Sequence, residues 1–338
     1  MLRLELLLNL VIALAASFAA TFIAMPLLMK FLRERGIVGI DVHKPSRPEV
    51  PEMGGIGIVF GLFIGVLASM WVGSWAKYLA FLTTVAFTAL IGLIDDLYTL
   101  RAKVKTALTV LAFAPLLIFS MMFPSQIVLG RPELPFIGRL RLTIVYWLLL
   151  PFAIAVPANA VNMMDTYNGV MSGSCAMASL SLLIACAILG RVEAALMSAA
   201  LLGALLAFYW YNRYPARVFA GDVGSLSVGA AIGAIAVIGR VEVVSITVLM
   251  PFIMNAFHSL TSLGGLLERR EIKERPVIVG EGGVLRANLN KGAPATLANL
   301  LLRKGPATEI ELVRAYHVLA ATASILGVLT ALLMGVRM

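Results

Sequence analysis

Ten apolar runs, each close to the length of a membrane-spanning helix, occupy most of this 338-residue chain. A helix needs roughly 20 predominantly apolar residues to cross the hydrocarbon core of a bilayer. Charged residues make up only 13% of the chain, against about 25% in soluble domains. The sequence therefore predicts an all-α, polytopic membrane protein with about ten transmembrane helices and small β-hairpins in its loops. The runs cover residues 4–32, 55–73, 78–97, 106–123, 142–163, 171–190, 193–211, 222–239, 243–266 and 312–336.

Because these runs fill nearly the whole chain, residues 1–338 are predicted to form a single integral-membrane domain. The first run ends without the small-residue pattern of a cleavage site, which favours a retained helix over a signal peptide. The longest polar segment covers residues 267–311. Within it we expect a hairpin around residues 280–283 and a short amphipathic helix at residues 295–303.

The formal net charge of +9 would suit a nucleic-acid partner, but its distribution favours a membrane protein. When the loops are assigned alternately to two sides, 19 of the 27 Lys and Arg residues fall on one side. The side rich in Lys and Arg is the cytosolic one. We therefore expect a multi-pass protein of the cytoplasmic membrane, with both termini outside and its polar motifs in the cytosol.

A polar stretch between the fifth and sixth runs is the strongest candidate for a site. Asn159, Asn162 and Asp165 recur every three residues, close to one stripe of a helix, and Asn168 with Gly169 predicts a turn after them. Polar groups are costly to bury in lipid and by default mark functional sites. Hydrogen bonding between helices accounts for one asparagine, but less readily for four polar groups at a membrane edge.

Asp95 and Asp96 lie where the third run ends, on the predicted cytosolic side. Acidic residues at the C-terminus of a helix oppose its dipole, so a solvated helix end explains them poorly. Neighbouring helical residues point about 100° apart, and the two carboxylates therefore cannot face one ion from an unbroken helix. We expect one of them to bind or activate a substrate and the other to pair with Lys103 or Lys105.

Asp222 directly precedes the core of the eighth run. It is either an N-cap aspartate or part of a phosphate site, because a helix N-terminus offers free N–H groups in both cases. The three histidines, His43, His258 and His317, show no metal-ligand spacing, so we expect no zinc site.

These groups permit one kind of chemistry better than others. The chain has no P-loop and no ordered Ser-His-Asp set. A few carboxylates with side-chain amides suit Mg²⁺, which keeps several waters and is completed by substrate phosphates. Lys and Arg nearby would neutralise phosphate charge as it shifts. The residues alone thus indicate magnesium-assisted phosphoryl transfer onto a lipid phosphate that enters from the bilayer.

Four short motifs follow one another along the chain: Pro51-Glu-Met-Gly-Gly55, Asp95-Asp96, Asn159-Ala-Val-Asn-Met-Met-Asp-Thr-Tyr-Asn-Gly169 and Phe219-Ala-Gly-Asp222. In order, topology and spacing they resemble the polyprenyl-phosphate N-acetylhexosamine-1-phosphate transferase superfamily, of the glycosyltransferase family 4 type. The resemblance implies transfer of GlcNAc-1-phosphate from UDP-GlcNAc to dolichyl or another polyprenyl phosphate. UMP would be released and a diphospholipid-linked sugar formed, as the first membrane step of glycan or N-glycan precursor synthesis.

The resemblance also implies roles for individual residues. Asp222 and Asn162 match the ligands of Mg²⁺, for which Mn²⁺ is the substitute ion. Asp95 matches the acidic residue that deprotonates or otherwise activates the lipid phosphate, and Asp96 supports it, so that the implied catalytic set is Asp95, Asp96 and Asp222. Implied substrate contacts are Lys105, Lys273 and Arg275 on phosphate, Glu52, Asn168 and Phe219 on uridine, and Asn159, Asp165 and Gly169 beside them.

The last polar segment departs from the bacterial members of this superfamily. Those members carry a histidine-rich motif there, whereas residues 259–316 of this chain contain no histidine. The stretch Lys273-Glu-Arg-Pro276 is more similar to the Arg-His-Arg segment of the eukaryotic enzyme, while Asp165 is shared with bacterial members. The mixture implies an archaeal-like enzyme closer to the GlcNAc branch, with residues 267–311 as its substrate-recognition loop.

Two other functions stay open at this point. One is phospho-MurNAc-pentapeptide transfer within the same superfamily. The other is a secondary transporter with broken helices, although transporters place polar residues near the bilayer midplane and often in repeated halves. The expected partners are a UDP-amino sugar, a polyprenyl phosphate, the bilayer and, by the resemblance, a second copy of the chain in a homodimer.

Overall fold

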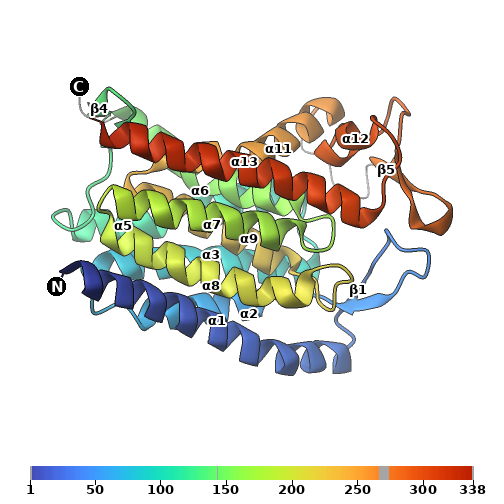
Figure 1. Cartoon of the computed structure of the whole chain (residues 1–338), viewed down its shortest axis with the longest axis horizontal. Helices are drawn as coiled ribbons and strands as arrows, with labels where there is room; N and C mark the ends of the chain where they lie inside the picture. Colours follow the sequence, from blue (N-terminus) through green and yellow to red (C-terminus); the bar gives the residue numbers. More distant parts are fainter. Residues whose placement is uncertain (1, 143, 266–273, 337–338) are drawn as a thin grey trace.

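Long helices run side by side along one axis, with short hairpins at their ends (Figure 1). The structure, a computed structural model, describes residues 2–142, 144–265 and 274–336. The helices are α1 (Leu2–Glu34), α2 (Gly55–Leu67), α3 (Trp75–Tyr98), α4 (Ala102–Leu111), α5 (Ala114–Met122), α6 (Ile144–Met164), α7 (Val170–Ile188), α8 (Val192–Asn212), α9 (Gly221–Gly239), α10 (Glu242–Val248), α11 (Met250–Leu263), α12 (Leu297–Leu302) and α13 (Glu309–Gly335). The strands are β1 (Val38–Ile40), β2 (Glu49–Pro51), β3 (Glu133–Leu134), β4 (Gly138–Arg139), β5 (Val277–Val279) and β6 (Leu285–Ala287).

The all-helical membrane architecture predicted from the apolar runs is confirmed. Among the described residues, eight helical segments are long and apolar enough to cross a bilayer, with α4 and α5 counted as one. The pair α10–α11 makes a ninth if it is one span bent by 66°. The bend has a local cause, because Pro251 lacks the N–H that would continue the helix.

The second apolar run forms a shorter helix than its length suggests. Only 13 residues, Gly55–Leu67, are helical, which at 1.5 Å per residue reaches roughly 20 Å, less than the hydrocarbon core. Turns follow the helix, where the Ser69 hydroxyl donates back to the carbonyls of Gly65 and Val66 and Gly73 has a φ of 83°. Ten apolar runs therefore give eight or nine candidate spans, together with the short helix α2.

Helix α9 is the buried centre of the bundle, and none of its residues is exposed. It packs against α3 and α6. Gly229 and Gly233 make the close approach to α6 possible, because an added Cβ would lie 2.3 Å from the carbonyl oxygens of Pro157 and Ala153 respectively. Small residues four positions apart on one helix face are typical of closely packed helices in membranes.

Replacing Gly229 with Ala is expected to lower the free energy of unfolding by about 1–3 kcal/mol, the usual cost of overpacking. Alanine at an ordinary helix position would instead stabilise the helix by up to about 1 kcal/mol. Gly335→Ala is the matched control, since an added Cβ there meets no atom within 4 Å. Thermal unfolding in detergent measures both, and an unchanged midpoint for Gly229→Ala would refute the tight packing.

The three hairpins are antiparallel and lie outside the helical bundle. In β1–β2, Val38 pairs with Pro51, and in β5–β6, Val277 pairs with Ala287. The hairpin expected around residues 280–283 and the short helix expected at residues 295–303 are both present, as β5–β6 and α12. Figure 1 shows β1, β5 and α12 at the end of the bundle opposite both termini. Which end faces the cytosol stays a prediction.

Candidate active site

Lys105 joins the two carboxylates that the sequence separates by more than 120 residues. Its Nζ lies 2.7 Å from Asp95 Oδ2 and 2.6 Å from Asp222 Oδ2. Asp95 lies near the end of α3, Lys105 lies on α4 and Asp222 lies in the first turn of α9. One ammonium therefore balances two carboxylates at the same end of three helices, and the group keeps a net negative charge.

Asn162 on α6 completes this cluster. Its Nδ2 donates to Asp222 Oδ1 at 2.5 Å and to the Ser225 hydroxyl at 2.8 Å. One turn earlier, Asn159 Nδ2 donates to Thr109 Oγ1 at 2.8 Å, one turn beyond Lys105 on α4. Residues three or four apart lie on one helix face, so one face of α6 meets one face of α4. The predicted stripe of three residues is thus found for the two asparagines, whereas its third member, Asp165, lies just beyond the end of α6.

Asp95 and Asp96 point in different directions, as their adjacency on a helix requires. Asp95 Oδ1 accepts the N–H of Leu100 at 2.6 Å, while its Oδ2 holds Lys105. The Asp96 carboxylate accepts hydrogen bonds from the backbone N–H groups of Asp222 at 2.8 Å and Val223 at 3.0 Å. A carboxylate at a helix N-terminus is favourable, so Asp96 fixes the turn of α9 that carries Asp222.

Asp165 follows the end of α6 and is partly exposed. Burial raises the pKa of Asp165 to about 7, and the charges of Asp222, Glu52 and Asp96 act in the same direction. Four acidic side chains thus lie within electrostatic range of one another. Their mutual repulsion would be relieved by a bound cation, which is an observation in favour of a metal site.

The raised pKa predicts how stability depends on pH. The folded chain favours the protonated form of Asp165, so ionisation costs stability as the pH rises from the unfolded pKa of about 4 towards 7. Wild type should therefore lose thermal stability between about pH 4 and pH 7, and Asp165→Asn should lose less over the same interval. Equal losses for both, measured in metal-free detergent solution, would contradict the raised pKa.

Glu52 and Phe219 come together because their two motifs pair through the backbone. The N–H of Phe219 donates to Pro51 O, and the N–H of Gly54 donates to Phe219 O, both at 2.8 Å. The two side chains flank Gly39, where an added Cβ would lie 3.0 Å from Glu52 Oε2 and 3.2 Å from Phe219 Cδ2. Two of the three predicted uridine contacts, Glu52 and Phe219, are therefore neighbours.

Asn168 belongs to a second charged network that sequence reasoning did not find. Its backbone N–H donates to Glu309 Oε1 at 3.1 Å, and its Nδ2 donates to Asp41 Oδ2 at 3.0 Å. Lys44 pairs with Asp41 and, at 3.2 Å, with Glu309 Oε2. Glu309 follows Thr308, the N-cap of a capping box. That box was readable in the sequence, but nothing there connected it with Asn168.

The turn after Asn168 is fixed from two sides. Gly169 has a φ of 83° and caps α7, as the expected turn requires. His317 on α13 lies with Nε2 3.1 Å from Gly169 O. Beside the Asn168 network lies a cavity of about 190 Å³, whose lining includes His43, Lys44, Tyr214, Gly283, Thr308 and Glu309.

Of the two basic residues expected on the diphosphate, the structure describes only Arg275, and no hydrogen bond or ion pair joins its side chain to the cluster. Lys273 lies outside the described residues. Arg275 is exposed just before β5, and only its main-chain carbonyl has a partner within the described ranges, the amide of Asn288. A phosphate role for either residue stays a prediction.

The donor atoms present fit an incomplete magnesium site. Within residues 2–142, 144–265 and 274–336, no three His, Cys, Asp or Glu side chains are grouped closely enough to hold a metal ion. Mg²⁺ commonly uses one or two carboxylates and takes its other ligands from water and substrate phosphates. Asp222 and Asn162 are in direct contact through the Asn162 amide nitrogen, and a turn of that amide would place its oxygen beside the carboxylate as a second ligand.

Comparison with known proteins places this site within a family. Residues 78–240 match the model of glycosyl transferase family 4. A Saccharolobus solfataricus protein named "Putative UDP-N-acetylglucosamine--dolichyl-phosphate N-acetylglucosaminephosphotransferase" is 31% identical over 64% of this chain and 67% of its own length. The chain belongs to glycosyl transferase family 4. The resemblance read from the four motifs is thereby confirmed.

Other relatives extend the similarity along the chain. A putative glycosyltransferase of Methanocaldococcus jannaschii is 29% identical over 90% of this chain and 93% of its own length. A phospho-N-acetylmuramoyl-pentapeptide-transferase of Thermodesulfovibrio yellowstonii is 34% identical over 63% of this chain and 66% of its own length. The family 4 match runs from α3 to the end of α9, so it includes Asp95, Lys105, Asn162 and Asp222.

Proposed function

We propose that this family 4 member is a Mg²⁺-dependent enzyme of the cytoplasmic membrane that transfers GlcNAc-1-phosphate. The donor is UDP-GlcNAc, the acceptor is dolichyl or another polyprenyl phosphate, and the products are UMP and a diphospholipid-linked sugar. The observation that carries the proposal is the Lys105 ammonium held between Asp95 and Asp222, with Asn162 on the second carboxylate. The name of the Saccharolobus relative supports the same reaction.

Asp95 and Lys105 serve the acceptor in this proposal. Asp95 Oδ2 takes a proton from the lipid phosphate, and Lys105 holds the resulting negative charge close to the donor. An oxygen of the lipid phosphate then attacks the sugar-bound phosphorus. The bond from that phosphorus to the bridging oxygen of UMP breaks, and a new phosphoanhydride bond joins the lipid phosphate to the sugar phosphate. Positioning and charge stabilisation are the main protein contributions to such transfers.

The donor is held on the side of the second charged network. Glu52 and Phe219 lie on either side of Gly39. They are proposed to contact uridine, together with Asn168. The cavity beside Lys44 offers room next to Asn168 for part of the UDP-sugar. Arg275 and Lys273 remain the proposed phosphate contacts from the last polar segment. Asp96 and Gly169 are proposed to position other residues rather than touch substrate. Asp96 holds the turn that carries Asp222, and Gly169 forms the turn after Asn168.

Asp222 and Asn162 would hold Mg²⁺, with Mn²⁺ as its substitute. When bound there, the ion would neutralise charge on the diphosphate and on the leaving UMP. Asp96 orients Asp222 for this role by holding the backbone N–H groups of the same turn. Lys105 keeps the Asp222 carboxylate ionised and directed towards the site.

A second sugar donor has specific support. The Thermodesulfovibrio relative, named as a phospho-N-acetylmuramoyl-pentapeptide-transferase, is 34% identical to the aligned part of this chain. The motif residues do not separate the two donors, because both reactions break the same bond. Family membership and the grouping of the acids at one end of the bundle argue against the secondary transporter. A homodimer is part of the proposal, and light scattering of the purified protein tests it.

The test is release of UMP by purified protein with UDP-GlcNAc, polyprenyl phosphate and Mg²⁺. Release should require both the lipid and the metal ion, so reactions without lipid and with a chelator are the controls. Release with UDP-MurNAc-pentapeptide in place of UDP-GlcNAc would keep the reaction and change the donor. Absence of release with either donor would overturn the proposal.

A further inference from the structure

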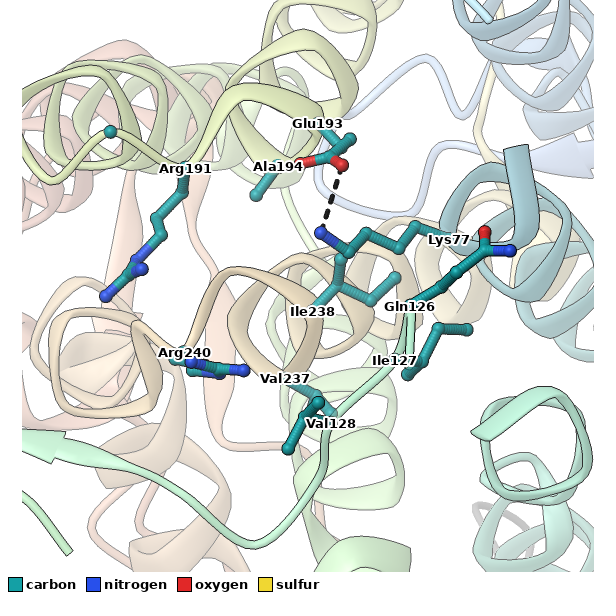
Figure 2. Close-up of a pocket in the computed structure, with 11 residues that line it drawn as sticks. Lys77, Gln126, Ile127, Val128, Arg191, Glu193, Ala194, Val237, Ile238 and Arg240 are labelled. Atoms are coloured by element: carbon teal, nitrogen blue, oxygen red, sulfur yellow. Dashed lines mark hydrogen bonds and ion pairs between the residues drawn. The ribbon is translucent and has the colours of Figure 1, made fainter. Parts of the chain in front are cut away.

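Figure 2 shows the residues around a polar cavity of about 140 Å³. This cavity lies at the end of the bundle opposite the candidate active site. It is bounded by the starts of α3 and α8, the end of α9 and the segment that precedes β3. Cavities of about 150 Å³ accept a molecule the size of benzene, so a phosphate group fits. Lys77 on the cavity wall and Asp95 in the site are 18 positions apart on α3, which separates them by roughly 27 Å.

The charges that line this cavity are mainly positive. Lys77, Arg191 and Arg240 supply three cations, and Glu193 is the one carboxylate among the lining residues. Lys77 Nζ lies 3.0 Å from Glu193 Oε1. In Figure 2 a dashed line joins these two side chains, while Arg191 and Arg240 have no dashed partner among the residues drawn.

The two arginines are incompletely satisfied. Arg191 donates through Nη2 to Glu133 Oε2 at 2.5 Å, but its Nε is buried without a partner. Within the described parts of the chain, the Arg240 guanidinium has no hydrogen bond or ion pair. Burial and the charges of Arg139 and Arg191 lower the pKa of Arg240. A bound anion would supply the missing acceptor and offset the repulsion.

The distribution of cations along the chain supports a specific role. Eight of the 27 Lys and Arg residues fall outside the side that the alternating loops make positive. Five of these eight, Lys77, Arg131, Arg139, Arg191 and Arg240, line this cavity or act on Arg240. The carboxylates of Glu133, Glu193 and Glu242 oppose them. The group therefore keeps a net positive charge at the end where the chain has few cations.

We propose that this cavity binds a phosphate-class anion, either the headgroup phosphate of an anionic lipid or free inorganic phosphate. Arginine presents a planar set of donors that matches phosphate oxygens. Arg240 and the buried Nε of Arg191 provide the unoccupied donors, and Lys77 adds a third cation. The proposal is independent of the transferase reaction, because none of these residues belongs to the candidate active site.

The test compares wild type with Arg240→Gln by thermal unfolding in detergent at constant ionic strength. The titrants are inorganic phosphate, short-chain phosphatidylglycerol and, as the zwitterionic control, phosphatidylcholine with the same chains. Arg141→Gln is the matched variant, because Arg141 is exposed and does not line the cavity. Phosphate that binds at the candidate active site affects all variants equally, so the difference between variants isolates this cavity.

We expect Arg240→Gln to weaken anion binding by about tenfold or more, the loss of one charge-assisted hydrogen bond, while Arg141→Gln matches wild type. A response to phosphatidylglycerol alone identifies a lipid headgroup, and a response to inorganic phosphate identifies a soluble anion. Val128→Phe, which fills the cavity without changing charge, should also abolish binding and serves if Arg240→Gln does not fold. Identical titrations for wild type, Arg240→Gln and Val128→Phe would overturn the proposal.

Discussion

Replacing Asp222 with Ala is expected to lower kcat for UMP release by at least about 10³-fold, the upper range for the loss of one preorganised electrostatic group. The Asp222 carboxylate accepts hydrogen bonds from Lys105 and Asn162. Its loss therefore removes the proposed metal ligand and the link between the other two side chains. The carboxylate lies in a turn that Asp96 holds through the backbone, and the fold should therefore survive the substitution.

The control for this variant is Glu34→Gln, which removes an exposed carboxylate whose nearest cation, Lys30, lies 3.9 Å away. It should retain full activity. A second readout is stabilisation by Mg²⁺ together with UDP, which should disappear in Asp222→Ala. Near-normal turnover of Asp222→Ala would refute the assignment of Asp222 as a metal ligand.

Replacing Lys105 with Met is expected to lower kcat/KM by about 10²-fold or more, because a cation that stabilises transferred phosphate is lost. The change also leaves Asp95 and Asp222 facing each other without the ammonium that lies within 2.7 Å of both. Removing one member of a buried charge group is costly, since the remaining charges are uncompensated. Thermal stability should therefore fall as well.

Lys103→Met is the matched control, because Lys103 is exposed two residues earlier on the same helix. It should behave as wild type in both assays. Lys105→Arg should restore stability more than activity, since it keeps the charge but changes the donor geometry. Equal losses for Lys103→Met and Lys105→Met would show that general basicity of this loop, and not the ion pair, supports the reaction.

Much of the site was predictable from local spacing. The stripe of Asn159 and Asn162 and the divergence of Asp95 and Asp96 follow from helical geometry, and the structure confirms both. Lys103 and Lys105 were equal candidates from charge alone. The structure selects Lys105, which lies one turn before Thr109 on the face of α4 that meets α6.

Other features depend on contacts between distant segments and have no local pattern. The network of Asp41, Lys44 and Glu309 around Asn168 joins the first loop to the start of α13 across more than 260 residues. The short length of α2 could not be predicted from hydropathy either, because the apolar run continues through the turns that end the helix. The exposure of Arg275, just before the β5–β6 hairpin, likewise has no local pattern in the sequence.

The central claim is that a phosphoryl group moves together with the sugar. UDP-GlcNAc labelled with ³²P at the β-phosphorus tests it directly, when purified protein is incubated with polyprenyl phosphate and Mg²⁺. The account predicts that the label passes into the lipid product while unlabelled UMP is released, and that Asp222→Ala gives neither. Label that remained on UDP while sugar appeared on the lipid would contradict the account, because it would show transfer of the sugar without its phosphate.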